Sequence, residues 1–159
     1  MRAALAMLVA ILVAGCGFQL RGSSNLPFQT IYVPGSSGGV ALDLKRAIES
    51  SSNTRVVDTP KDAQAVFQLI GAQQEKEILS LTGAGRVREY RLRYRVTYRV
   101  HDAKGLDLIP STTLRQVRDV TFNDSAVLAK ETEDQLLYRD MQNDMVQQIL
   151  RQLAAAQVK

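Results

Sequence analysis

The clearest pattern in the chain is an alternation of apolar and polar residues within residues 86–100. From position 90 to position 100 the even positions carry tyrosine, leucine or valine, whereas four of the five odd positions carry arginine. These four residues, named here the arginine row, are Arg91, Arg93, Arg95 and Arg99. Because side chains on one face of a β-strand recur at every second residue, the pattern predicts a strand with one buried face and one positively charged face.

Four further segments resemble strands by their β-branched, aromatic and other apolar residues. They are residues 28–33, 55–58, 65–72 and 112–122, of which 55–58 is the weakest. A turn at residues 103–106 leads from the arginine strand to the last of them, so the two are expected to form a hairpin. The polar residues 73–77 show no clear preference for strand, helix or loop.

Two segments have the helical period instead. Residues 40–48 place apolar side chains at i, i+4, i+7 and i+8, with charged residues on the other side. Residues 126–157 contain neither proline nor glycine, and apolar residues recur there at four-residue spacing: Leu137, Met141, Met145, Ile149 and Leu153. Residues 123–125 (Asn, Asp, Ser) precede this segment and are types that cap helix N-termini. A short and a long amphipathic helix are predicted.

The order of these elements is β, α, several β and α. The chain has 159 residues and a mass of 17.6 kDa, a length that suits one domain. Short-range hairpins with a helix before and after them predict an α+β two-layer sandwich, with two helices packed on one face of a mostly antiparallel sheet of about four strands. This single domain is expected to span residues 27–159.

The N-terminus has the pattern of a lipoprotein signal. Of the first 15 residues, 13 are hydrophobic, and small residues lead to Cys16. Residues 1–15 are therefore predicted to be a signal peptide, and residues 16–26 a lipidated tether whose Cys16 thiol takes the diacylglyceryl group. The alternative is an ordinary signal peptide followed by an incidental cysteine. Gly17 replaces the aspartate that retains enterobacterial lipoproteins in the inner membrane, so a periplasm-facing lipid anchor in the outer membrane is favoured.

Composition limits the chemistry of the mature chain. One cysteine and one histidine exclude an internal disulfide framework and a cysteine zinc cage, and no metal or cofactor is expected. Without Arg2 the chain has 19 basic and 16 acidic residues, a net charge of +3 that is modest for a nucleic-acid binder. The tyrosines also point away from the arginines, and the chain is tethered outside the cytoplasm. Nucleic acid is not an expected partner.

Catalytic residues are hard to assemble from this sequence. His101 lies beside Asp102 at a strand end, and Ser111 or Ser125 would have to act as the nucleophile. Residues 83–85 read as a turn followed by a strand rather than as a phosphate loop. The protein is not expected to be an enzyme.

The arginine row permits two interpretations. It is either an ordinary solvated strand face or a binding surface, because guanidinium groups bind phosphates and carboxylates through two parallel hydrogen bonds. An anionic amphiphile or an acidic protein surface would fit the second interpretation. The sequence leaves both open.

Several short motifs resemble the LptE family of lipopolysaccharide-assembly lipoproteins. Residues 16–22 read CGFQLRG, similar to the start of the mature family members. Residues 122–124 (FND) and 129–131 (AKE) resemble the entry to the family's last helix, and Glu89-Tyr90 resembles a third family position. The likeness spans residues 16 to about 153, and the order and spacing of the motifs carry it.

This resemblance implies a two-layer domain that plugs the outer-membrane β-barrel LptD, assists its assembly and helps deliver lipopolysaccharide to the outer leaflet, without catalysing a reaction. Lys130 matches a family lysine and is the candidate that the resemblance supplies for lipopolysaccharide phosphate. Arg91, Arg93 and Arg95 are candidates by their periodicity alone. The alternatives are a pilot lipoprotein for another outer-membrane channel and a periplasmic hydrolase.

The lipid anchor can be tested at Cys16. Cys16→Ser removes the sulfur nucleophile, so the variant is expected to take up no fatty-acid probe during metabolic labelling. It should also leave the outer membrane unless a barrel partner holds it there. Equal labelling of the variant and the wild type would contradict the assignment.

Overall fold

A computed structural model describes residues 25–35, 38–121 and 127–157 of the chain. The helices and strands of this part are β1 (Thr30–Tyr32), α2 (Gly39–Ser51), β2 (Arg55–Val57), the 3-10 turn η1 (Pro60–Asp62), β3 (Ala65–Leu81), β4 (Val87–His101), β5 (Asp107–Thr121) and α3 (Val127–Ala154). The predicted capping residues 123–125 lie outside the described residues.

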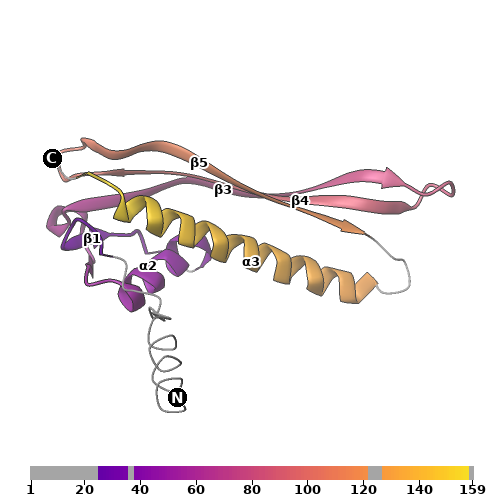
Figure 1. Cartoon of the computed structure of the whole chain (residues 1–159), viewed down its shortest axis with the longest axis horizontal. Helices are drawn as coiled ribbons and strands as arrows, with labels where there is room; N and C mark the ends of the chain where they lie inside the picture. Colours follow the sequence, from indigo (N-terminus) through magenta and orange to yellow (C-terminus); the bar gives the residue numbers. More distant parts are fainter. Residues whose placement is uncertain (1–24, 36–37, 122–126, 158–159) are drawn as a thin grey trace, which may run out of the picture.

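Two short strands and three long ones form one mixed sheet in the order β2-β1-β3-β4-β5. β1 runs parallel to β2 and β3, whereas β3, β4 and β5 form an antiparallel meander. Both helices lie on the same face of this sheet, and α3 runs along most of the meander (Figure 1). The predicted α+β two-layer sandwich is confirmed, with five strands instead of about four because the weakest strand segment does pair.

β3 extends well beyond the predicted residues 65–72. It has 17 residues and pairs with β4 as far as Leu81, so the polar segment 73–77 is also strand. On the outer face of the sheet, Glu75 lies opposite Arg93 and Glu77 opposite Arg91. Opposite charges on paired strands stabilise a sheet. The partner strand therefore decides the structure of a segment that has no buried face of its own.

The core lies between the sheet and the helices. The even positions of β4 are buried, as the alternation predicts: Tyr90, Leu92, Tyr94, Val96, Tyr98 and Val100. Met141, Met145, Ile149 and Leu153 of α3 cover them and are fully buried, and α2 adds an apolar face of its own. The predicted inner face of β4 and the predicted helix faces are confirmed.

Three tyrosines of β4 also hydrogen-bond to α3 through their hydroxyl groups, an arrangement named here the tyrosine ladder. Tyr90 donates to Asp134 (2.5 Å), Tyr94 to Gln142 (2.9 Å) and Tyr98 to Gln152. Gln142 in turn donates to Asp43 of α2 at 2.6 Å. The ladder ties the ends of buried aromatic rings to both helices, so their hydroxyls keep partners inside the protein.

The inner face of β4 is testable by a single substitution. Leu92 is 0% exposed, so Leu92→Asp would bury an unpaired carboxylate and is expected to lower the free energy of unfolding by several kcal/mol. Leu106→Asp makes the same change at a side chain that is 63% exposed and should alter stability by about 0.5 kcal/mol or less. Thermal or urea melts measure both. Overlapping melts of wild type and Leu92→Asp would show that the wrong face was assigned.

Candidate functional site: the charged outer face of the sheet

The arginine row lies on the sheet face that the helices leave open. Its strand, β4, is between β3 and β5, so each arginine has cross-strand neighbours on both sides. β3 contributes glutamate and glutamine side chains to this face, and β5 contributes Asp119, Val117 and Arg115. The face is therefore a patterned mixture of charges rather than a uniformly positive surface.

Arg91 is held by Asp119 through two parallel hydrogen bonds. Its Nε lies 2.6 Å from Asp119 Oδ1 and its Nη2 lies 2.7 Å from Asp119 Oδ2. The hydrogen bonds from Arg91 lower the pKa of the Asp119 carboxyl, and the same contact raises the pKa of Arg91. Two of the donor groups of Arg91 are thus already used within the protein.

Arg93 and Arg95 lean diagonally towards β3. Arg93 Nη2 lies 2.5 Å from Glu77 Oε2, which is a close ion pair. Arg95 Nη1 is held more loosely, at 3.8 Å from Glu75 Oε1 and 3.4 Å from Gln73 Oε1. Among the described residues the buried Nε of Arg95 has no hydrogen-bond partner. Arg95 is therefore the less satisfied of the two.

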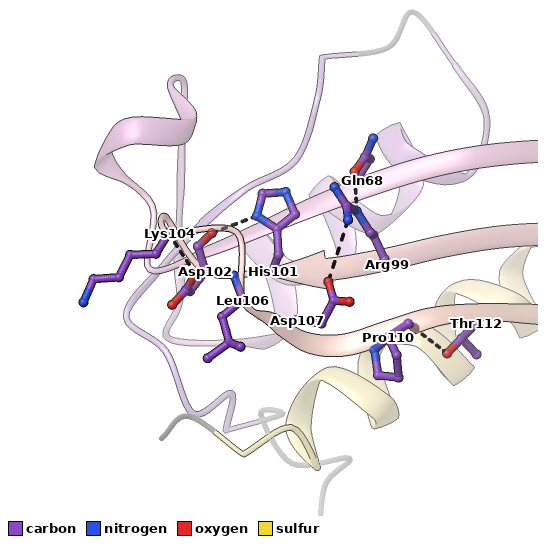
Figure 2. Close-up of polar contacts among 9 residues, drawn as sticks. All are labelled: Gln68, Arg99, His101, Asp102, Lys104, Leu106, Asp107, Pro110 and Thr112. Atoms are coloured by element: carbon purple, nitrogen blue, oxygen red, sulfur yellow. Dashed lines mark hydrogen bonds and ion pairs between the residues drawn. The ribbon is translucent and has the colours of Figure 1, made fainter.

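Arg99 occupies the end of the row near the β4–β5 turn. Figure 2 shows its guanidinium between Gln68 of β3 and Asp107 of β5. Its Nε donates to Gln68 Oε1 at 2.6 Å, and its Nη1 lies 3.9 Å from Asp107 Oδ1. This arginine bridges three strands.

Arg115 of β5 lies directly opposite Arg95 of β4. Its exposed side chain makes no hydrogen bond or ion pair with any residue that the structure describes. A depression of about 380 Å³ lies here, lined by Arg93, Arg95, Arg115 and Val117, with Tyr94 and Gln116. Sequence reasoning placed Arg115 on a strand but missed its position, because the register of β5 depends on the turn and on an irregularity after Tyr98.

Lys130 lies near the beginning of α3, on the helical layer. Its side chain is 19% exposed, and its Nζ forms an ion pair with Glu133 Oε2 at 2.7 Å. α3 covers the inner face of the sheet, whereas the arginine row lies on the outer face (Figure 1). The structure does not bring Lys130 and the arginine row together.

A second charged cluster joins β3, β4 and α3 on the inner side. Lys76 Nζ lies 2.7 Å from Asp134 Oδ2 and 3.9 Å from the centre of the Tyr90 ring. Burial first, and then the hydrogen bond to Asp134, raise the pKa of the Tyr90 hydroxyl, while burial raises the pKa of Tyr98 to about 12. Sequence analysis did not find this cluster. The contacts among Lys76, Asp134 and Tyr90 hold α3 on the sheet.

His101 and Asp102, considered for catalysis, do not form a carboxylate–imidazole pair. His101 Nδ1 lies 2.7 Å from the backbone oxygen of Asp102, as Figure 2 shows. The Asp102 carboxylate instead accepts hydrogen bonds from the backbone N–H groups of Lys104 and Leu106, both at 2.8 Å. The Asp102 carboxylate thus shapes the turn, and the imidazole contacts the backbone of Asp102 instead. Ser125 lies outside the described residues.

The described residues offer neither a metal-binding cluster nor a membrane-spanning helix. No group of three or more histidine, cysteine, aspartate or glutamate side chains there could hold a metal ion. None of the helices in that part is long and apolar enough to cross a membrane.

Between α2 and α3 lies a depression of about 680 Å³ with a mostly polar lining that includes Asp43, Arg46, Tyr138 and Arg139. Asp43 accepts a hydrogen bond from Gln142, and its Oδ1 lies 3.9 Å from Arg46 Nη1. The Tyr138 hydroxyl donates to the backbone oxygen of Glu75. These contacts connect the two helices and the edge of β3.

Comparison with known proteins decides the family. The model of the LptE family, described as "Lipopolysaccharide-assembly", matches residues 28–153, nearly the whole described domain. This chain belongs to the LptE family. The resemblance found in the sequence motifs is confirmed.

Named LptE relatives cover most of this chain. The LPS-assembly lipoprotein LptE of Yersinia enterocolitica is 33% identical over 165 residues, which cover 96% of this chain and 76% of the relative. The protein of the same name from Yersinia pestis is 30% identical over 159 residues, with the same coverage.

Solved structures of lipoproteins share the LptE-family fold of this chain. The NMR structure of the uncharacterized lipoprotein B from Nitrosomonas europaea is 42% identical, with a TM-score of 0.75 over 87% of this chain and 91% of that one. The crystal structure of the rare lipoprotein B from Shewanella oneidensis is 25% identical, with a TM-score of 0.69 over 79% and 94% of the two chains.

The predicted site residues of this LptE-family chain fall into three separate places. Arg91, Arg93 and Arg95 are on the outer face of the sheet, Lys130 is on the helical layer, and Cys16 lies outside the described residues. Their roles in binding and lipidation remain predictions.

The contact between Arg91 and Asp119 can be tested by titration. Because its pKa is lowered in the fold, Asp119 is expected to titrate below the ordinary value of about 3.9. Its ion pair contributes stability above the pKa of the unfolded state, and this contribution is lost as the pH falls through the folded pKa. Carbon-13 NMR of the carboxyl measures the midpoint, and Arg91→Gln should raise it. A midpoint unchanged by Arg91→Gln would contradict the pairing.

Proposed function

We propose that this protein is an outer-membrane lipoprotein that assists the assembly of the LptD β-barrel, plugs it, and helps deliver lipopolysaccharide to the outer leaflet. The observation that carries the proposal is the match of the lipopolysaccharide-assembly family to residues 28–153. The named LptE relatives, whose alignments cover 96% of this chain, support the same role. The function is one of binding and assembly, without catalysis.

The shape and surface of the domain support a plug. The strands of the meander have 17, 15 and 15 residues, so at ~3.3 Å per residue they are roughly 50 Å long. The interior of an outer-membrane barrel is polar. The outer sheet face offers the lumen paired charges rather than an apolar surface. An elongated, stiff and polar body of this kind suits the inside of a wide barrel.

In this proposal the N-terminus supplies the membrane anchor. Cys16 carries the acyl chains, and residues 16–26 tether the domain to the periplasmic side of the outer membrane. Each buried methylene contributes ~0.8 kcal/mol, so several acyl chains together hold the protein at the membrane. The barrel and the lipid anchor would then retain it independently.

Lipopolysaccharide binding is assigned to cationic groups on both layers. Lys130, near the beginning of α3, is the candidate with a family match. Arg91, Arg93 and Arg95 offer guanidinium groups on the outer face. Because the two sets lie on opposite layers, they would contact different phosphates or different partners.

Both parts of this function can be tested on protein extracted from outer membranes with mild detergent. Lys130→Glu should weaken lipopolysaccharide binding about tenfold, because a charge-assisted contact is lost, and should retain the LptD barrel. Lys104→Glu makes the same reversal in the β4–β5 turn, which lies at the opposite end of the meander from the start of α3 (Figure 1), and is the matched control. Binding assays and the amount of co-purified barrel are the two measurements.

The triple variant Arg91→Gln, Arg93→Gln and Arg95→Gln separates the two roles of the outer face. Weaker lipopolysaccharide binding with the barrel retained would assign these arginines to the lipid, and loss of the barrel alone would assign them to the lumen. If the folded triple variant keeps both partners, the row is a solvated surface. If wild-type protein carries no large β-barrel partner, the proposed function itself is wrong.

A further inference from the structure

We propose that Arg93, Arg95 and Arg115 form an anion site on the outer face of the sheet, and that its ligand is a phosphate monoester. The inference deepens the proposed function, because it names the ligand chemistry of one part of the arginine row. It adds Arg115, which belongs to another strand, and it leaves out Arg91.

The first observation is a pair of like charges. Arg95 and Arg115 are direct cross-strand partners on the same face. Side chains in such positions have Cβ atoms about 4.5–5.5 Å apart, and like charges there destabilise a sheet. Arg115 has no partner among the described residues that would offset the repulsion. A bound anion between the two guanidinium groups would turn this repulsion into attraction.

The second observation is the unsatisfied donor of Arg95. Its Nε is buried and has no hydrogen-bond partner in the described part of the chain. The contacts that hold the rest of the group are long, 3.4 Å to Gln73 and 3.8 Å to Glu75. A small rotation of the guanidinium would therefore present the Nε–H to a ligand. A phosphate oxygen would supply the missing acceptor.

The third observation is the depression itself. It measures about 380 Å³ and is lined by all three arginines, with Val117 beside them. The head of a phosphate monoester has one phosphorus and four oxygens and fills only part of this space. The remainder is open to the group that carries the phosphate. The site is thus a surface pocket and not a closed cavity.

The charges around the depression favour a phosphate. Three guanidinium groups face two carboxylates, since Glu77 contacts Arg93 and Glu75 is near Arg95. The cluster therefore has a net charge of about +1 before a ligand binds. A phosphate monoester has about −1.5 to −2 charges at pH 7 and three free oxygens, whereas a carboxylate has only two oxygens. Three separate guanidinium groups match the tetrahedral phosphate better than the planar carboxylate.

Arg91 does not belong to this site. Its Nε and Nη2 are both held by Asp119, at 2.6 and 2.7 Å. To bind phosphate it would first have to break two charge-assisted hydrogen bonds. Among the described residues, Glu77 contacts one nitrogen of Arg93, and the contacts of Arg95 are long, so these two arginines keep donors for a ligand, with Arg115 as the third member.

The site is tested first with inorganic phosphate on the full lipidated chain in neutral detergent micelles at pH 7.5. Sodium phosphate should raise the melting temperature of the wild type by several degrees more than sodium chloride of equal ionic strength. Arg115→Gln should lose this difference. Arg99→Gln removes an arginine from the same face of β4 and should keep it. An equal rise with chloride would mean that salt merely screens the repulsion, and would overturn the proposal.

A second variant distinguishes the loss of phosphate binding from a folding defect. Arg115→Glu places a carboxylate opposite Arg95, so it should melt above the wild type in phosphate-free buffer and show no response to phosphate. This gain in stability together with loss of binding is expected only if the like-charged pair serves a ligand. A phosphate response that persists in both Arg115 variants would overturn the site.

Binding of lipopolysaccharide then identifies the source of the phosphate. If the lipid is the ligand, Arg115→Gln should bind it about tenfold more weakly than the wild type, and the two should bind dephosphorylated lipopolysaccharide equally. If Arg115→Gln changes only the response to inorganic phosphate, the site is supported and its ligand is a soluble phosphate ester. Failure of the wild type to bind any lipopolysaccharide would contradict the proposed function, while the phosphate response would still support the site.

Discussion

The tyrosine ladder, whose hydrogen bonds join β4 to α3, is the interaction on which the rest of this structure depends. Tyr90, Tyr94 and Tyr98 are four residues apart on β4, a spacing of ~13 Å along a strand. Their acceptors Asp134, Gln142 and Gln152 are eight and ten residues apart, which is ~12 and ~15 Å along a helix. The spacing of the tyrosines along the strand therefore matches the spacing of their acceptors along the helix. Each hydroxyl therefore reaches a partner only when helix and strand run side by side in one register.

This register decides what the opposite face of the sheet can do. Because the tyrosine side chains of β4 are buried in the core, the side chains at its odd-numbered positions point to the outer face. The guanidinium groups then meet whatever β3 and β5 place beside them. Where the neighbour is Asp119, two donors of the arginine are held by one carboxylate, and where it is Arg115, the charge is not offset. Function on the outer face is thus a consequence of packing on the inner one.

Sequence reasoning succeeded where one periodic signal determined the structure. The buried face of β4, the apolar face of α3 and the two-layer arrangement all follow from spacing within a single segment. The second half of β3 could not be found in this way, because most of its side chains are exposed, and Ile78 and Leu81 are more than half exposed. Its structure comes from pairing with β4. The opposition of Arg95 and Arg115, and the separation of Lys130 from the arginine row, likewise depend on register and layering between segments.

The position of α3 at the end of the chain has a consequence for the order of folding. The three ladder contacts join residues 44, 48 and 54 positions apart, and each needs a residue of the last helix. The β3–β4–β5 meander can pair through short loops as soon as it is available, but the part of its apolar face that α3 covers stays exposed until α3 arrives. Contacts of long sequence separation form late and leave surface exposed in the meantime. During folding, the paired sheet would therefore present its tyrosine face to the solvent for an interval, and the arrival of the last helix ends it.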